Sequence, residues 1–323
     1  MMGGRERVCV TGAGGFLASW ILKFLLLKGY HVHGTVRDPG DEKNAHLKKL
    51  DKASENLQLF QTDLQNSDGL CAAIAGWTGV FHVASPVPPA DAVINSEVEL
   101  MEPAVTGTRN VLDACLKTQV KKVVVVSSIG AIALNPNWPK GQVMNEDCWS
   151  DLAFCKAIKQ SYCFSKTAAE SEAWEYAKRS GLNVVTICPS VIIGPLLQPT
   201  MNSSSLYLLK FLQDGWEAAD NGSRAFVDVR DASEATLMLY EKPEAEGRYL
   251  CSSHEIRTKD LVEKLKSMYP VYNYPKSFKE EETEVIRLSS EKLQNLGWRY
   301  RPLEDTLTAA VNNYAENGHM GKN

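Results

Sequence analysis

Two patterns of apolar and polar positions alternate along the first two hundred residues. Short runs rich in β-branched residues recur, and longer stretches with helical periodicity separate them. This alternation is typical of βαβ units, which build a parallel sheet through right-handed crossovers. The sequence therefore predicts an α/β fold with a doubly wound parallel sheet. Its six strands are expected at 7–11, 31–36, 57–61, 79–83, 122–128 and 183–188.

The spacing of these elements loosens after Pro189. Prolines recur from there on between segments of mixed character, at 195, 199, 243, 270, 275 and 302. We expect residues 1–189 to form the doubly wound domain and residues 190–323 to form a smaller α/β substrate domain. Within the latter, 225–241 predicts a short strand and a helix with Asp231 as N-cap, and this segment is expected to return to the core of the first domain.

Charge, cysteines and hydropathy exclude several classes of protein. The net charge of −4 and the pI near 5.9 leave no global basic surface for nucleic acid. The eight cysteines contain no C-x-x-C pair, and together with the six histidines they give no compact zinc spacing. The first apolar run begins within seven residues of the start, and the longest, at 20–27, is too short to cross a bilayer. We therefore expect a cytoplasmic protein with no metal site, no nucleic-acid partner and no membrane anchor.

A glycine-rich segment, TGAGGFLASW at 11–20, follows the first predicted strand and opens the first predicted helix. In a Rossmann fold, a dinucleotide binds its pyrophosphate at this place, against the N–H groups of the helix N-terminus. The spacing is G-x-x-G-x-x-A, because Leu17 stands where the G-x-G-x-x-G fingerprint has its last glycine. A tight turn without a ligand is the alternative. The residues expected against the cofactor are Gly12, Gly15, Phe16 and Leu17.

The second predicted strand ends in TVRDP, where the ribose 2′-position of a bound dinucleotide is expected. An acidic residue there would favour NAD, whereas the guanidinium of Arg37 can bind a 2′-phosphate through two N–H groups. Lys43 would add a second positive charge, and Asp38 is expected to face the following turn. These residues predict NADP(H) as the cofactor and make 1–189 an NADP-binding Rossmann domain.

Two further groups of residues follow strands of the predicted sheet. Asp63 and Leu64 come after the third strand, and Val83, Ala84 and Ser85 come at the end of the fourth. Ligands of open α/β sheets bind at the carboxyl ends of the strands, so all five are expected near the cofactor. Asp63 has two readings, an adenine contact or an ordinary helix cap.

Tyr162 and Lys166 are four residues apart in QSYCFSK, a segment with a helical pattern, and therefore share one helix face. A phenol beside an ammonium group can act as an acid or base near neutral pH, because the positive charge lowers the pKa of the phenol. Ser127 and Ser128 end the fifth strand, and the pleat should point only one of them inward. We predict that one of these two serines fixes a carbonyl oxygen while Tyr162 donates the proton. A chance match of the short Y-x-x-x-K pattern is the alternative.

These residues resemble the extended short-chain dehydrogenase/reductases, and more closely the plant cinnamoyl-CoA reductase and dihydroflavonol reductase group. The likeness runs almost end to end, through TGAGGFLASW, TVRDPGDEKNAHL, HVASP, SSIGA, EDCWSDLAFCK, GPLLQPTMN and VDVRD. The resemblance implies a catalytic triad of Ser128, Tyr162 and Lys166. It also implies that Arg37 and Lys43 bind the 2′-phosphate and that Pro189 neighbours the nicotinamide. The implied activity is NADPH-dependent reduction of a small phenolic carbonyl compound in lignin-forming phenylpropanoid metabolism, with a monomer as the working expectation.

The segments GPLLQPT and WSDLAFCK favour the cinnamoyl-CoA reductase side of this group, but two positions depart from it. The CoA-ester reductases carry a motif like NWYCYGK where this chain has QSYCFSK, and a histidine where this chain has Tyr207, three residues before Lys210. A hydroxycinnamaldehyde, which carries no CoA, is therefore the rival substrate. Dihydroflavonol enzymes place an asparagine where Ala133 stands. A polar contact to the flavonoid ring would therefore be missing here, and a dihydroflavonol is the less favoured substrate. A nucleotide-sugar epimerase and a cofactor-sensing regulator without turnover are further alternatives.

Two other groupings around the predicted site have alternative interpretations. Cys155 and Cys163 could form a disulfide that stiffens the catalytic segment, or they could be two small buried apolar residues, which we favour. Four aromatic residues could line a phenyl-sized pocket or could belong to the core. They are Phe154, Tyr207, Phe211 and Trp216.

Overall fold

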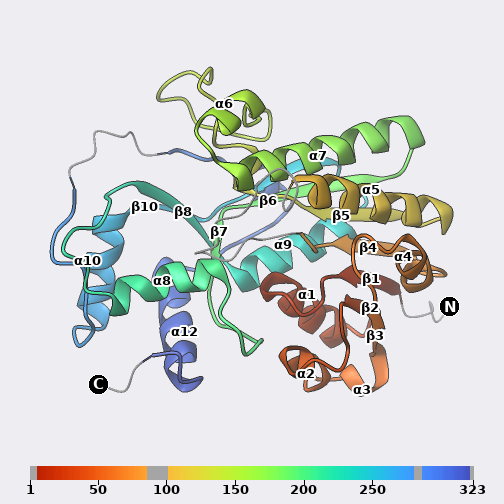
Figure 1. The fold of residues 1–323 in the computed structure, drawn as a ribbon, viewed down its shortest axis with the longest axis horizontal. Coiled ribbons are helices and arrows are strands. Elements are labelled where there is room, and N and C mark those ends of the chain that lie inside the picture. Colours follow the sequence, from red (N-terminus) through yellow and green to blue (C-terminus); the bar gives the residue numbers. More distant parts are fainter. Residues whose placement is uncertain (1–5, 86–100, 280–285, 321–323) are drawn as a thin grey trace.

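The computed structural model describes residues 6–85, 101–279 and 286–320, and its strands form two sheets (Figure 1). The larger is a seven-stranded sheet in which every neighbouring pair is parallel. From one edge to the other its strands are β3 (Leu57–Gln61), β2 (His31–Val36), β1 (Arg7–Thr11), β4 (Gly79–His82), β5 (Lys122–Val126), β6 (Val184–Pro189) and β9 (Gly247–Cys251). The chain starts in the middle, runs out to β3 and returns to β4 on the other side of β1. This is the doubly wound Rossmann arrangement that the sequence predicts.

The strand predictions agree closely with the structure. Those at 7–11, 31–36 and 57–61 match to the residue, and the other three differ by at most two residues at either end. The central strands β4 and β5 are buried along their whole length, because helices cover both faces of the sheet. β9 was not among the six predicted strands. It pairs with β6 from Val185↔Gly247 to Pro189↔Cys251, so the second half of the chain supplies an edge strand of the large sheet.

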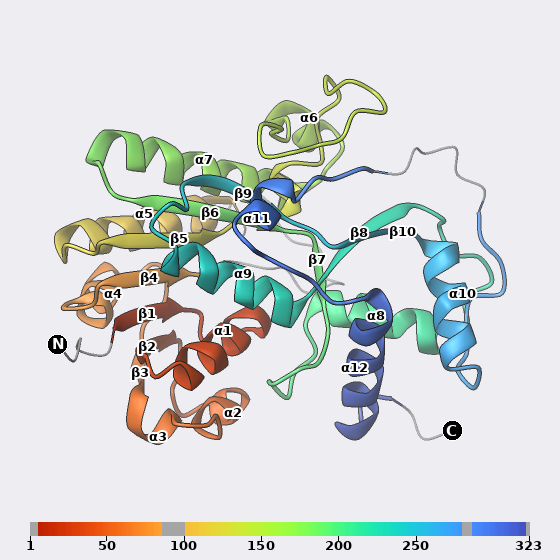
Figure 2. The same cartoon turned by 180° about the vertical axis from the view of Figure 1, so that it is seen from behind.

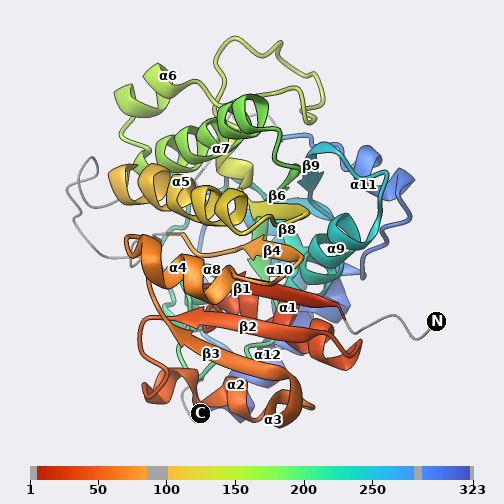
Figure 3. The ribbon, with the colours of Figure 1, turned by 90° about the vertical axis from the view of Figure 1, so that its right-hand side faces the viewer.

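Helices cover the two faces of the large sheet (Figure 3). One face carries α4 (Ser67–Ile74), α5 (Glu102–Lys117) and α7 (Ser161–Ser180), and the other carries α1 (Phe16–Leu27) and α9 (Val229–Glu241). Shorter helical segments lie in the connections: η1 (Glu42–Asn44), α2 (Ala45–Lys48), α3 (Ala53–Asn56), η3 (Ile129–Ala131), α6 (Leu152–Ala157) and α11 (Glu291–Asn295).

The alternation of side chains along β1 divides the core into two apolar clusters. Val8 and Val10 belong to the cluster under α1 and α9, while Cys9 between them belongs to the cluster under α4, α5 and α7. All three side chains are fully buried. Burial of apolar surface on both faces holds the sheet between its helices and fixes the carboxyl ends of β1, β4 and β5 side by side.

The smaller sheet lies beyond the carboxyl ends of the large one (Figures 1 and 2). Its middle strand β8 (Ser223–Asp228) pairs parallel with β7 (Val191–Ile193) and antiparallel with β10 (His254–Arg257). The neighbouring helices are α8 (Ser203–Gln213), α10 (Thr258–Met268) and α12 (Leu303–Glu316). Among the described residues, no helix combines the length and the apolar character that crossing a membrane requires.

The strand and helix predicted at 225–241 are β8 and α9, and α9 packs against α1 on the large sheet. The predicted N-cap Asp231 is wrong. Asp228 caps the helix instead, because its Oδ1 accepts a hydrogen bond from the N–H of Arg230 at 2.7 Å. Asp231 lies inside the first turn, where its Oδ2 accepts from the N–H of Arg301 at 2.9 Å. It thereby ties the segment before α12 to α9.

Candidate active site

The glycine loop joins the end of β1 to the start of α1. Gly12 has a φ of +67°, and a Cβ atom at this position would lie 3.0 Å from the Cα of Ala84. A side chain is therefore excluded both by the left-handed backbone and by the close approach of the segment after β4. Gly15 is the N-cap of α1, and no side chain caps this helix. The first N–H groups of α1, those of Phe16 and Leu17 among them, are thus left for a ligand.

The segment after β2 brings the predicted 2′-phosphate residues together with an acid that the sequence analysis did not consider. Arg37 is exposed directly after Val36. Asp38 faces its own turn as expected, since its Oδ1 accepts from the N–H of Gly40 at 2.7 Å. Lys43 contacts Asp41, with 2.5 Å between Nζ and Oδ2. The hydrogen bond from Lys43, together with the charges of Lys43 and Arg37, lowers the pKa of Asp41.

Residues after β3 and β4 line the neighbouring part of the sheet edge. Asp63 is exposed, and its Oδ1 accepts from the N–H groups of Gln65 at 2.8 Å and Asn66 at 3.1 Å. Asp63 thus closes a turn before α4, whose N-cap is Asn66, so the helix-cap alternative is wrong, and an adenine contact stays a prediction. Leu64 is partly buried and lies against Gly107 of α5.

The segment after β4 is fastened to β1 beside the glycine loop. Thr11 Oγ1 accepts hydrogen bonds from the N–H groups of Val83 at 3.1 Å and Ala84 at 3.0 Å. These two residues and Ser85 are partly exposed. The structure therefore places Ala84 next to Gly12, where the cofactor is expected, with Val83 and Ser85 on either side of it in the chain.

The two serines after β5 point in different directions, as the pleat predicts. Ser127 Oγ donates to Glu170 Oε2 at 2.7 Å. Ser128 begins η3, where its Oγ accepts from the N–H of Gly130 at 3.0 Å, and it also forms a hydrogen bond with Tyr162. Ser128 is thus the serine on the side of Tyr162.

Tyr162 and Lys166 lie in consecutive turns near the start of α7. Lys166 is buried, and its Nζ donates to the carbonyl oxygen of Val126 at the end of β5, at 2.9 Å. Burial lowers the pKa of Lys166 to about 8, against the charge of Glu170, which raises it. Ser128, Tyr162 and Lys166 therefore meet where β5 ends against α7.

The predicted effect of Lys166 on Tyr162 is not what the structure has. Burial raises the pKa of Tyr162, and the hydrogen bond with Ser128 only partly offsets this. The Lys166 ammonium is bound to Val126 instead. Tyr162 is therefore fully protonated at neutral pH, which suits a group that has to donate a proton.

His82, at the end of β4, was not predicted as part of the site. Its Nδ1 lies 3.0 Å from Thr11 Oγ1, and its Nε2 lies 3.2 Å from Thr108 Oγ1. Burial and the nearby charge of Lys166 lower the pKa of His82 to about 3, so the ring is neutral. His82 thus links β1, β4 and α5 under the site without adding charge. The sequence could have indicated this role, because His82 directly precedes Val83, which was predicted to lie near the cofactor.

Three further features named from the sequence are Pro189, the cysteines and possible metal ligands. Pro189 ends β6 and is buried beside Cys251 of β9. All eight cysteines lie in the described ranges and carry free thiols, Cys155 and Cys163 included. In residues 6–85, 101–279 and 286–320, no three His, Cys, Asp or Glu side chains come together as metal ligands would.

The aromatic residues proposed as pocket lining are mainly packed against one another. Tyr207 and Phe211 are edge-to-face at 4.9 Å between ring centroids, and Phe211 and Trp216 at 5.4 Å. Phe211 is buried in the larger apolar cluster. Phe154 lies on a separate element, α6. Core packing thus accounts for Phe211, and Tyr207 is held against it.

Comparison with known proteins gives consistent matches. The profile of the "NAD dependent epimerase/dehydratase family" matches residues 8–251. Cinnamoyl-CoA reductase 1 from Petunia hybrida is 44% identical over 316 residues, which cover 97% of this chain and 93% of that protein. The crystal structure of vestitone reductase from alfalfa (Medicago sativa L.) superposes with a TM-score of 0.84 at 31% identity, covering 98% of this chain and all of that one. Gre2 from Candida albicans, solved in complex with NADPH, gives a TM-score of 0.83 at 27% identity over 97% of this chain and 99% of that one.

Proposed function

The chain belongs to the NAD dependent epimerase/dehydratase family, and from that premise we propose that it reduces a hydroxycinnamoyl-CoA thioester to the hydroxycinnamaldehyde with NADPH. It is a nicotinamide-dependent oxidoreductase of the short-chain dehydrogenase/reductase type and is cinnamoyl-CoA reductase-like in function. One observation carries the proposal for its chemistry. The hydroxyls of Ser128 and Tyr162 are hydrogen-bonded at the end of β5, and the buried ammonium of Lys166 lies one helical turn further along α7.

The residues around the glycine loop fit a dinucleotide. A backbone cradle that a Cβ at Gly12 would fill lies before a helix N-terminus that no side chain caps. We propose that Gly15, Phe16 and Leu17 hold the pyrophosphate there, while Asp63, Leu64 and Val83–Ser85 line the adenosine and nicotinamide ribose side. NADPH is proposed over NADH because Arg37 and Lys43 are cations and Asp38 is turned away into its own loop.

The proposed reaction needs a proton and a stabilised oxygen from the protein. When bound, NADPH would supply the hydride for the thioester carbon. Ser128 and Tyr162 donate hydrogen bonds to the carbonyl oxygen as it gains negative charge. Tyr162 is the proton donor, and Lys166 keeps a positive charge beside it. The C–S bond then breaks as the oxyanion re-forms a carbonyl group, which gives the aldehyde, and the proton from Tyr162 ends on the sulfur, so that CoA leaves as a thiol. Pro189, at the end of β6, is proposed as a neighbour of the nicotinamide.

The remaining parts of the chain have proposed roles that follow from this assignment. Residues 1–189 would form the NADP-binding domain, and 190–323 the substrate domain, with 225–241 returning to the large sheet. A small phenolic compound is the proposed substrate partner. A reducing compartment, the cytoplasm, suits the eight free thiols.

Reduction of a free hydroxycinnamaldehyde is the second candidate, and one observation favours it. Tyr207 stands where CoA-ester reductases have a histidine, and its ring is packed edge-to-face on Phe211. It is therefore not free to bind a phosphate as a histidine would. Lys210, one turn later on α8, is exposed and retains a positive charge near this place.

The test is NADPH oxidation measured side by side with feruloyl-CoA, coniferaldehyde and a dihydroflavonol. The proposal expects feruloyl-CoA to give the highest kcat/KM. A higher value with coniferaldehyde would select the second candidate. No oxidation with any of the three, together with epimerisation of a UDP-hexose, would place the chain among the epimerases.

A further inference from the structure

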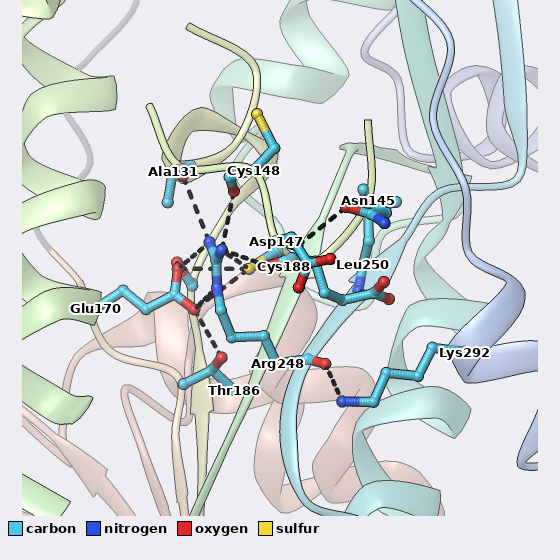
Figure 4. Close-up of polar contacts among 12 residues, drawn as sticks. Ala131, Asn145, Asp147, Cys148, Glu170, Thr186, Cys188, Arg248, Leu250 and Lys292 are labelled. Atoms are coloured by element: carbon cyan, nitrogen blue, oxygen red, sulfur yellow. Dashed lines mark hydrogen bonds and ion pairs between the residues drawn. The ribbon is translucent and has the colours of Figure 1, made fainter. Parts of the chain in front are cut away.

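A buried ion pair between Glu170 and Arg248 joins α7 to β9 (Figure 4). Glu170 Oε1 lies 2.8 Å from Arg248 Nε, and Glu170 Oε2 lies 3.1 Å from Arg248 Nη2. The Glu170 side chain is 0% exposed and that of Arg248 is 7% exposed. Such a two-point contact fixes both position and orientation of the two groups.

The other polar atoms of the pair are also bonded. Thr186 Oγ1 donates to Glu170 Oε1 at 2.6 Å, and Ser127 Oγ donates to Oε2 at 2.7 Å. Arg248 Nη1 donates to the carbonyl oxygens of Glu146 at 2.8 Å and Cys148 at 2.9 Å. The guanidinium lies over the ring of Trp149, 3.6 Å from its centroid. A buried pair with this many partners is held in one arrangement.

These contacts join all the elements that carry the proposed catalytic groups. Glu170 is on α7, four residues after Lys166 and so on the same helix face. Ser127 is the neighbour of Ser128 at the end of β5, and Arg248 Nη2 also donates, at 3.4 Å, to the carbonyl oxygen of Ala131, where η3 ends. Displacement of the pair would therefore move Ser128 and Lys166 relative to each other.

Two apolar side chains could join α7 to β9 equally well, so a structural role alone does not explain why Glu170 is charged. Burial lowers the pKa of Lys166, and the carboxylate of Glu170 opposes this. Other groups facing Lys166 in the described part of the chain carry no charge. His82 on β4 is neutral, burial keeps Cys188 on β6 a thiol by raising its pKa, and the same effect keeps Tyr162 on α7 a phenol. Burial would raise the pKa of Glu170 as well, but the hydrogen bonds and charge of Arg248 outweigh it and keep Glu170 ionised.

We propose that Glu170 and Arg248 are positioning residues of this reductase, which hold Ser128 and Lys166 in register. The carboxylate of Glu170 also favours the charged form of Lys166. The proposal rests on the proposed function, because that function assigns Lys166 to the reaction. Glu170 acts through Lys166 and Ser127, and Arg248 acts through Glu170. Neither side chain has to touch the substrate or the cofactor.

The direct test is a titration of Lys166 in lysine-labelled protein by NMR, with its signal assigned through Lys166→Arg. Two variants are compared with the unaltered protein: Glu170→Gln, and Glu170→Gln combined with Arg248→Met, which leaves no unpaired buried cation. We expect the titration midpoint of Lys166 to fall by about one pH unit in Glu170→Gln, as expected on loss of a nearby opposite charge, and by a smaller amount in the double variant, which also loses the positive charge of Arg248. An unchanged midpoint in folded Glu170→Gln would overturn the proposal.

The kinetic test separates positioning from a purely structural role. In the double variant kcat should fall about tenfold with its alkaline limb moved to lower pH, while KM for NADPH stays within about threefold. If kcat and its pH profile return fully to those of the unaltered protein whenever the stability of the fold is restored, the pair has only a structural role. Glu172→Gln is the matched control, since this carboxylate lies on the same helix but pairs with Arg109 and Arg179 at the surface.

The two proposals fail in different ways. If the unaltered protein oxidises NADPH with none of the three carbonyl substrates, the proposed function is wrong. The titration of Lys166 needs no substrate and still decides the role of Glu170.

Discussion

The Nζ atom of Lys166 lies 2.9 Å from the carbonyl oxygen of Val126, and Lys166 is buried, with 6% of the residue exposed. A cation held by one main-chain oxygen at the end of β5 is fixed in position but poorly solvated. Its position suits an interaction with a ligand at the carboxyl ends of the strands. Its poor solvation makes it sensitive to pH.

The first prediction is that kcat/KM for NADPH falls on the alkaline side of about pH 8. Burial lowers the pKa of Lys166 to about 8, so the ammonium is lost as the pH rises through this value and is retained below it. The pH dependence of kcat/KM reports the groups of the free enzyme, and this profile is the measurement. Lys166→Arg keeps the cation at all these pH values, and any activity it retains should lack this alkaline limb. A flat profile in the unaltered protein through this range would contradict the assignment.

The second prediction concerns the proton donor. Tyr162→Phe removes the phenol and leaves the ring, and loss of a positioned acid costs about 10²- to 10⁴-fold in rate. NADPH oxidation on any accepted substrate should therefore fall by this factor, while the affinity for NADPH, measured by fluorescence titration, stays within a few-fold. Full activity of the variant would discard Tyr162 as the acid.

Third, Arg37→Asp should shift the preference from NADPH toward NADH. The new carboxylate repels a 2′-phosphate and can accept a hydrogen bond from a 2′-hydroxyl. The ratio of kcat/KM values for the two cofactors is the measurement. If the ratio does not change, the 2′-phosphate is recognised elsewhere.

Asp41→Asn should tighten NADPH binding by about two- to fivefold, which is the range of an exposed ion pair. The substitution frees Lys43 from the contact with Asp41. The new amide oxygen can still accept from the N–H of Lys43, as Asp41 Oδ1 does at 3.0 Å, so the turn is preserved. The gain should shrink as salt is added. Asp68→Asn, an exposed residue at the start of α4, is the control, and an equal gain there would point to net charge alone.

The fifth prediction is on stability. Arg248→Met leaves the carboxylate of Glu170 buried without its partner, which costs about 3–5 kcal/mol in the free energy of unfolding. Urea denaturation measures it. Arg109→Met breaks a surface pair with Glu172 and should cost no more than about 1 kcal/mol. If Arg248→Met and Arg109→Met lower the free energy of unfolding by similar amounts, the buried pair is no more sensitive to loss of its partner than the surface pair.

Sequence patterns were sufficient for most of the large sheet, because its inner strands are continuous apolar runs bounded by helical segments. The face shared by Tyr162 and Lys166 followed from their spacing alone, and the opposite directions of Ser127 and Ser128 from the pleat. The candidate site residues lie where local rules place them, after the ends of β1 to β5, at the end of β6 and near the start of α7.

Long-range contacts explain what the sequence did not reveal. β9 is a short run with a charged residue, Arg248, in a buried strand, and no local pattern shows that its partner is Glu170, 78 residues earlier. Asp41 was overlooked because its effect depends on how the turn folds it back toward Lys43. The choice of Asp228 over Asp231 as a cap depends on where β8 ends, and a single sequence does not fix that boundary.

The late arrival of β9 has a consequence for the newly synthesised chain. When α7 and β6 have left the ribosome, the carboxylate of Glu170 still has no guanidinium, and β6 is an open edge whose main-chain groups invite pairing with other chains. Only after residue 251 has been translated can β9 pair with β6 and bring Arg248 to the carboxylate of Glu170. Nascent chains truncated before β9 should therefore depend on chaperones, although every strand of the glycine-loop half is already present.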